Sequence, residues 1–186
     1  PCMLPVDRDG APLMNAVLYG VDTRAAREIE ELTDEIGTEA LLDRCGNALT
    51  SQSVGPKILW LRRNRPDIFA RTHKILNSSS FLVHRLTGRY VIDHYSASGF
   101  TPLYSARTLG WDDAFADRII GPERLPETLW TAEVAGVVTP EAAEQTGLKA
   151  GTPVTAGTID AAAEALSVGV LGAGDMMVMY GSTIFI

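Results

Sequence analysis

The sequence has few cysteines, no long apolar run and no clustered basic segment, and each absence excludes a class of protein. Its two cysteines, Cys2 and Cys45, are too few for a disulfide framework. No apolar run approaches the ~20 residues of a membrane-spanning helix. Lys and Arg are scattered, and a net charge of -7 disfavours binding to a phosphate backbone. We therefore expect a cytoplasmic protein that binds a small molecule, with no nucleic-acid and no membrane partner.

Several common site motifs are also missing. The glycine-rich loop that carries a Walker lysine is absent, which excludes a P-loop kinase for these residues. The segment 172–174 (GAG) lacks the third glycine of a dinucleotide-binding loop and precedes a predicted strand instead of following one. His73, His84 and His94 have no metal-ligand spacing among themselves or with the cysteines, so we expect no metal site built from these residues.

The apolar and turn residues that are present predict alternating strands and helices. The first two-thirds of the chain is predicted to contain strands at 3–7 and 13–19 joined by the turn 7–10, helices at 25–36, 39–44 and 56–64, a strand at 74–76 and a helix at 79–86. Gly37 and Gly88 are expected to close helices, and Pro66 is expected to stop one. The stretch 93–109 has no clear period and is expected to be mainly loop with short helix.

The last third of the chain gives the clearest pattern. Thr139 is an expected N-cap, Pro140 suits the first helical position, and Gly147 ends that helix. A strand at 153–156, a helix at 159–168, a strand at 176–180, a turn at 181–183 and a return strand from residue 184 follow. This order of elements predicts a mixed α/β fold that finishes in a hairpin.

Asp160 is the first candidate site residue, because the segment 153–160 (PVTAGTID) runs from a strand through a glycine turn into a helix. Ligands of α/β proteins gather beyond the carboxyl ends of strands. A helix N-terminus also favours the ionised carboxylate that a general base needs. The alternative, that Asp160 merely caps the helix, stays about equally favoured because Asp is a common N-terminal residue.

Two further candidates are weaker when taken alone. Backbone N–H groups and hydroxyls in the turn Gly181-Ser182-Thr183 could bind phosphate oxygens, although a plain hairpin turn is the more common use of such residues. Lys57 on the helix at 56–64 could serve a ligand, but helical lysines more often extend to solvent. Trp60 by itself indicates core packing.

Read in order, these segments resemble the FGGY carbohydrate kinases, with xylulokinase-like members as the most similar. The resemblance covers nearly the whole chain and is strongest in three runs near the end, which Asp160 follows. Residues 6–13 (VDRDGAPL) resemble the D-x-x-G-x-P-L hairpin of the family, 19–25 (YGVDTRA) its Trp-x-Asp-x-Arg segment, and 56–61 (PKILWL) its first signature. The segments 86–88 with Asp93 and 96–98 resemble the stretch that follows. The strongest runs are 136–143 (GVVTPEAA), 146–148 (TGL), 151–157 (GTPVTAG) and then Asp160.

The resemblance implies a ribonuclease-H-like (actin-like ATPase) fold of the α/β class. Family members have two such domains, with the sugar and MgATP in the cleft between them. Residues 1–170 then correspond to most of the N-terminal sugar-binding domain, and residues 171–186 to the first hairpin of the C-terminal ATP-binding domain. The start at Pro1 and the apolar end suggest an internal fragment. The first phosphate-binding hairpin and most of the second domain are expected to be missing, so we expect this fragment alone to bind nucleotide poorly.

The resemblance also implies a reaction and roles for named residues. Asp160 corresponds to the catalytic aspartate, which takes the proton from the attacking sugar hydroxyl. Lys57 and Gln52 fall at or near positions that contact the sugar in some members. Gly181, Ser182 and Thr183 correspond to a turn near the ATP phosphates. The implied cofactors are ATP and Mg²⁺, and the implied substrate is a small sugar, such as the ketopentose xylulose.

Two departures leave the substrate open. Val54 stands three places before the lysine, where the signature prefers a small hydroxyl residue or proline. Ala161 follows the aspartate, where many members carry an amide that can help to hold the sugar. A non-catalytic sugar-binding sensor and a chaperone-type actin-like ATPase are the alternative functions. The sequence names neither the sugar nor the oligomeric state, and a homodimer stays open.

Overall fold

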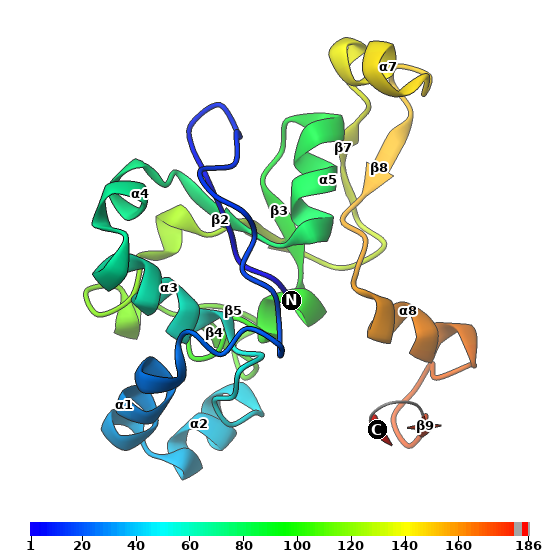
Figure 1. Ribbon diagram of the computed structural model, residues 1–186. Coiled ribbons are helices and arrows are strands. Elements are labelled where there is room, and N and C mark those ends of the chain that lie inside the picture. The colour runs from blue at the N-terminus through cyan, green and yellow to red at the C-terminus, as the bar shows by residue number, and fades with distance from the viewer. Residues whose placement is uncertain (181–183, 186) are drawn as a thin grey trace.

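The computed structural model describes residues 1–180 and 184–185, and it has the mixed α/β order that the sequence predicts. The N-terminal part forms a body around helices α1 to α6, and the last third of the chain runs along one side of it (Figure 1). The strands pair two by two, as β1–β2, β3–β6, β4–β5, β7–β8 and β9–β10, and only β3–β6 is parallel. No helix of the described residues has the length and apolarity to cross a membrane.

The element bounds are as follows. The α-helices are α1 Ala26–Ile36, α2 Thr38–Cys45, α3 Val54–Asn64, α4 Pro66–Arg71, α5 Ser78–Thr87, α6 His94–Ser98, α7 Pro140–Thr146 and α8 Asp160–Ser167. The strands are β1 Leu4–Val6, β2 Lys74–Leu76, β3 Val91–Asp93, β4 Tyr104–Ser105, β5 Gly110–Trp111, β6 Glu127–Leu129, β7 Val134–Val137, β8 Pro153–Thr155, β9 Met179–Tyr180 and β10 Ile184–Phe185. Two short 3-10 helices cover Asp113–Phe115 and Pro122–Arg124.

Helix α3 is the centre of the main core. Almost every residue of its first two turns is buried, and α1 and α4 pack beside it, while α2 packs against α1. Leu32 of α1 and Leu41 of α2 are fully buried. The backbone N–H of Val54 donates to the carbonyl of Gly99 at 2.9 Å, which ties the start of α3 to the end of α6. The core cluster includes the following buried residues: Met3, Val17, Leu32, Leu41, Ile58, Leu61, Ile75, Ile92, Phe100 and Tyr104.

The predicted strand at 13–19 is wrong. Strand β1 pairs instead with β2, from far along the chain, with Leu4 opposite Leu76 in an antiparallel register. Residues 13–19 keep an isolated bridge between Met3 and Val17, joined by two backbone hydrogen bonds of 2.8 and 2.9 Å, and one further 3.0 Å bond from the N–H of Leu13 to the carbonyl of Pro5. Pro5 and Pro12 lack N–H groups, so a continuous ladder between the two segments cannot form.

The helix predictions are largely confirmed, with one helix missed. Gly37, Gly88 and Gly147 each follow a helix with a positive φ, and the Thr139 hydroxyl accepts from the N–H of Ala142. Asn64 ends α3, but Pro66 does not simply stop a helix. It begins α4, because proline suits the first helical position, where an N–H would have no intrahelical partner.

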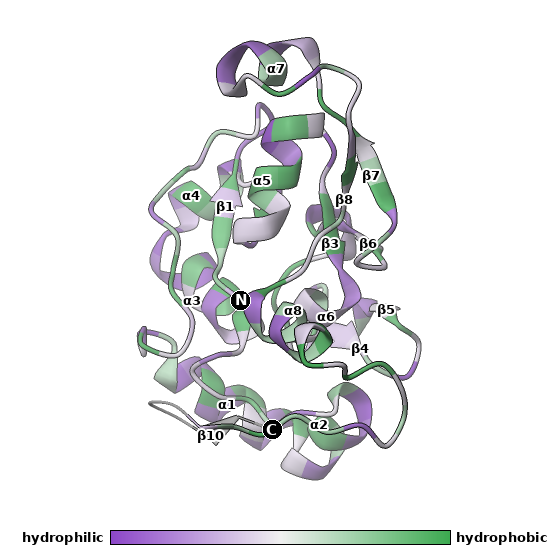
Figure 2. Ribbon diagram, turned by 90° about the vertical axis from the view of Figure 1, so that its right-hand side faces the viewer, coloured by the Kyte–Doolittle hydropathy of each residue, from purple (hydrophilic) through white to green (hydrophobic). Residues whose placement is uncertain are grey.

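The final third of the chain determines where Asp160, the candidate base, lies. The β7–β8 hairpin lies beside α5 in both views, with α7 at its outer end and α8 at its inner end (Figures 1 and 2). Helix α8 then extends away from the body, and none of its residues is buried. Leu166 on α8 and Leu171 after it are exposed large apolar residues.

We expect Gly55→Ala to destabilise the complete protein that carries this chain. A Cβ at Gly55 would collide with the carbonyl oxygen of Thr101 and lie 2.7 Å from Cδ of Pro102. Overpacking of this kind costs about 1–3 kcal/mol. Urea denaturation measures the loss, with Gly110→Ala as the control because the nearest atom to its Cβ would be 4.0 Å away. A variant as stable as the control would show that α3 is not packed this tightly.

Candidate active site

The turn that carries Asp160 docks at the carboxyl ends of the parallel strands β3 and β6. The chain leaves β6 through residues 130–133, and the carbonyls of Thr131 and Glu133 accept from the N–H groups of Gly157 and Ala156 at 3.2 and 2.9 Å. Gly157 has a φ of 68°, a conformation that favours glycine, and turns the chain toward α8. Ligand sites of α/β proteins form at this edge of parallel strands.

Asp160 is the first residue of α8, at the strand-to-helix junction, and is exposed. The N-cap position belongs to Ile159, whose side chain has no hydrogen-bond acceptor. The Asp160 carboxylate accepts a 2.9 Å hydrogen bond from the N–H of its neighbour Ala161. The carboxylate therefore contributes to the helix start and still presents oxygen atoms to solvent.

Lys57 does not extend to solvent. This residue of α3 is only 1% exposed, and its ammonium donates to the carbonyl of Leu18 at 2.6 Å. Burial lowers the pKa of Lys57, and the nearby Asp22 carboxylate partly opposes this effect. An ammonium at this depth fixes the segment that starts at Leu18, because a buried cation needs its acceptors.

The same part of the chain carries an ion pair between Asp22 and Arg24, the two charged residues of the motif at 19–25. The guanidinium of Arg24 donates to both carboxylate oxygens of Asp22, at 2.9 and 2.7 Å. These hydrogen bonds from Arg24 lower the pKa of Asp22. The arginine is also stacked on Trp60, with its guanidinium carbon 4.8 Å from the ring centroid. The pair therefore joins the loop before α1 to the exposed side of α3.

Gln52 lies on the other side of this segment. It is exposed in the turn before α3, and its Cγ lies 3.9 Å from the point that a Cβ of Gly20 would occupy. The N–H of Gly20 donates to the carbonyl of Ser51 at 3.2 Å. Gln52 therefore lies near Gly20 at the surface, whereas Lys57 bonds to the carbonyl of Leu18 from the core.

Among the described residues, neither Lys57 nor Gln52 forms a hydrogen bond or ion pair with Asp160. Burial and then the charge of Asp160 raise the pKa of the Tyr95 phenol on α6. The candidate turn Gly181-Ser182-Thr183 lies outside the described residues.

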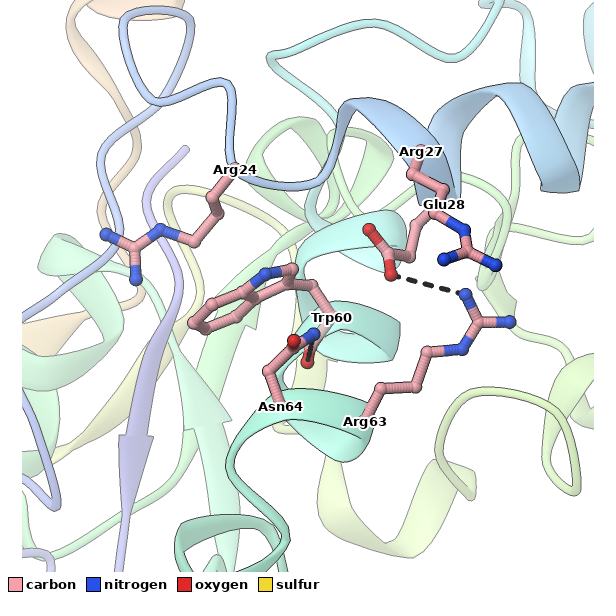
Figure 3. Close-up of a pocket in the computed structure, with 6 residues that line it drawn as sticks. All are labelled: Arg24, Arg27, Glu28, Trp60, Arg63 and Asn64. Carbon is pink, nitrogen blue, oxygen red and sulfur yellow. Dashed lines mark hydrogen bonds and ion pairs between the residues drawn. The ribbon is translucent and has the colours of Figure 1, made fainter.

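A pocket of about 480 Å³ opens between α1 and α3, next to the loop that carries Arg24 (Figure 3). Arg24 and Trp60 form one wall, and Arg27, Glu28, Arg63 and Asn64 line the rest. Trp60, predicted as core, is only partly buried and lines this pocket. Arg63 contacts Glu28 at 3.2 Å, so the positive charge of the pocket is largely neutralised. Asp160, Lys57 and Gln52 do not line it.

Two polar residues near Asp160 had no assigned role in the sequence. Thr158 donates to Asp93 at 2.8 Å, across a long separation in the chain. The signal that could have found Asp93 is a carboxylate directly after the apolar residues Val91 and Ile92, a pattern for which no strand was predicted. Thr158 could be noted only as a hydroxyl within the glycine turn, because nothing local identifies its partner.

Comparison with known proteins identifies the family of this chain. The family model for the N-terminal domain of the FGGY carbohydrate kinases matches residues 2–167. The chain belongs to the FGGY family of carbohydrate kinases. This FGGY chain therefore has the actin-like ATPase fold, and the predictions of family and fold class are confirmed.

The similar proteins are kinases named for different substrates. The chain is 32% identical over 179 residues to an autoinducer-2 kinase of Yersinia pestis bv. Antiqua (strain Angola), covering 95% of this chain and 33% of that protein. It is 25% identical over 182 residues to a xylulose kinase of Staphylococcus xylosus, covering 97% and 37%. The crystal structure of xylulose kinase from Rhodospirillum rubrum matches with a TM-score of 0.91 and 33% identity, covering 97% and 37%. This FGGY chain spans roughly a third of the length of these relatives.

The burial of Lys57 gives a pH-dependent prediction for the complete protein. Because its pKa in the folded state lies below the ordinary value of 10.5, the folded state binds this proton less readily than the unfolded state does. The contribution of Lys57 to stability should therefore rise with pH as the pH approaches that value from below. Urea denaturation of wild type and Lys57→Met measures the difference, and Lys149→Met, at an exposed lysine, supplies the background trend. A difference that falls as pH rises would contradict the burial.

Proposed function

We propose that the complete protein carrying this chain phosphorylates a small sugar with ATP, using Asp160 as the general base. The match of the FGGY model over residues 2–167 carries this proposal. The position of Asp160 supports it, because the carboxylate is exposed at the start of α8 and follows a turn docked on the ends of parallel strands.

The reaction needs little covalent chemistry from the protein. Asp160 takes the proton of one sugar hydroxyl while the oxygen attacks the γ-phosphorus of ATP. The bond from that phosphorus to its bridging oxygen breaks, and the products are the sugar phosphate and ADP. Phosphoryl transfer depends mainly on alignment and charge stabilisation. An exposed carboxylate held at a fixed turn is suited to this role.

Lys57 and Gln52 are proposed to bind the sugar together with the segment 18–20. An ammonium has three N–H donors, and the hydrogen bond to Leu18 uses one of them. Gln52 offers both a donor and an acceptor, as a sugar hydroxyl requires. The hydrogen bond from Lys57 to Leu18 and the nearby position of Gln52 at the surface place both side chains next to this segment.

The nucleotide would be bound largely outside the described residues. We propose that Gly181, Ser182 and Thr183 contact the phosphates, and that residues 171–186 begin the ATP-binding domain after the sugar-binding domain of residues 1–170. Among the described residues, no group of three or more His, Cys, Asp or Glu side chains is placed to hold a metal ion. Mg²⁺ would therefore enter with the nucleotide, held mainly by phosphate oxygens and water.

The sugar itself is a separate proposal. A ketopentose such as xylulose is supported by the xylulose kinases among the similar proteins. Autoinducer-2 is the second candidate, because the kinase with that name shares 32% of residues with this chain against 25% for the xylulose kinase of Staphylococcus xylosus. Ala161 beside the base leaves the usual amide contact unmade.

A substrate comparison tests this choice. The complete protein is assayed for ADP release with xylulose, autoinducer-2, other ketopentoses, hexuloses and polyols at equal concentrations. We expect one compound to give the highest kcat/KM, and xylulose is our prediction. A higher kcat/KM for autoinducer-2 would reject the ketopentose. Sugar binding without ADP release would indicate a sensor, and ATP hydrolysis indifferent to every compound would indicate another kind of actin-like ATPase.

The base is tested by Asp160→Asn in the complete protein. Asn keeps an oxygen that can accept from the N–H of Ala161, so the fold and sugar binding should survive. Asn cannot accept the hydroxyl proton, and general-base catalysis contributes ~10²–10⁴-fold. We expect kcat to fall by that factor, measured with the best sugar, while the melting temperature stays near wild type.

The matched control is Glu164→Gln, which removes one exposed negative charge from the same helix. Its kcat should remain close to wild type. A folded Asp160→Asn variant that keeps more than about a tenth of wild-type turnover would show that this aspartate is not the base, since the low end of the general-base range is larger. That result would favour the capping role.

A further inference from the structure

Asp93 is a buried carboxylate shared between two distant parts of the chain. It ends β3 at 1% exposure, and its Oδ2 accepts from the N–H of Ser96 at 3.1 Å and from the Thr158 hydroxyl at 2.8 Å. Its Oδ1 is buried and has no hydrogen-bond partner in the described part of the chain. A buried carboxylate with so few donors depends strongly on each of them.

Thr158 is the last point at which the chain is bonded to the body before α8. Ala156 and Gly157 donate to the body just upstream. Past Thr158, every hydrogen bond among the described residues stays within residues 159–185. Helix α8 also buries no residue. The orientation of Asp160 relative to the body therefore depends on the turn and on its Thr158 anchor.

We propose that Asp93 and Thr158 form a positioning pair that holds Asp160 in place for proton transfer. The inference rests on the proposed function, in which Asp160 is the base. Neither residue of the pair needs to touch the reacting atoms, since Thr158 acts through the two peptide units that lead to Asp160. A base must lie about 2.6–3.2 Å from the proton-bearing oxygen, and a misplacement of ~1 Å can cost ~10²-fold in rate.

Thr158 is the better position for a test, because Asp93 also caps α6 through Ser96. Thr158→Val exchanges the hydroxyl for a methyl group of similar size and leaves that cap intact. Thr158→Ser keeps the hydroxyl and should restore the tie. Thr152→Val is the matched control, since its hydroxyl bonds only to the nearby carbonyl of Lys149, at 2.8 Å.

The first measurement is steady-state kinetics of the complete protein with its best sugar. We expect Thr158→Val to lower kcat by at least ~10-fold with a smaller change in KM, because positioning of the base matters in the transition state. Thr158→Ser and Thr152→Val should stay within about threefold of wild type. Thr158→Val with a kcat within about twofold of wild type would overturn the proposal.

The second measurement separates positioning from general damage. Added to Asp160→Asn, Thr158→Val should cause no further loss of kcat, because residues that act through one group are not additive. A full additional loss would mean that Thr158 acts elsewhere and would overturn the pair. If Asp160→Asn itself keeps its turnover, the proposed base fails first, and that result is seen independently of Thr158.

The third measurement does not depend on activity. Amide hydrogen exchange at Ala156 and Gly157, whose N–H groups bond to residues 133 and 131, should be at least ~5-fold faster in Thr158→Val than in Thr158→Ser, since the turn loses its side-chain anchor. The amides of α5 should be unchanged in both variants. Equal exchange at Ala156 and Gly157 in the two variants would overturn the tie even if the protein proved to have no kinase activity.

Discussion

The burial of α3 is the constraint on which the site depends. Its first two turns are buried nearly all round, and this includes the ammonium of Lys57. A cation in that position requires an acceptor, and the carbonyl of Leu18 supplies it. The apolar packing of α3 thereby determines where the segment 18–24 lies, together with Gln52 and the ion pair that stacks on Trp60.

The second part of the site is held by polar contacts instead of packing. The turn at 156–158 is attached through backbone hydrogen bonds to residues 131 and 133 and through a side-chain bond to Asp93. Asp160 therefore stands on a well-anchored turn at the start of a helix that buries nothing. Under the proposed function, the side of the site that binds the sugar rests on a packed core, while the position of the base depends on a few hydrogen bonds. Such an arrangement suits a site that closes around a ligand.

Much of the fold could be predicted because the signals were local. Helices α1, α5 and α7 follow from apolar spacing and from the glycines after their last residues, and these predictions are confirmed within one or two residues. The segment at 13–19 has strand-like residues, but Pro5 and Pro12 prevent the ladder with β1. Asp160 was a candidate from the strand–turn–helix pattern around it and Lys57 was a weaker one, whereas Gln52 came from the resemblance to a family. The roles of all three stay predictions.

The sequence by itself determined the mixed α/β class, several helix ends and the family, since capping, turn chemistry and motif spacing act over a few residues. Tertiary structure alone decided that β1 pairs with β2, that Lys57 is buried under Leu18, and that Thr158 bonds to Asp93. The partners in each case lie far apart in the chain. No local pattern encodes such contacts, because they form only when the core has packed and every buried polar group must find a partner.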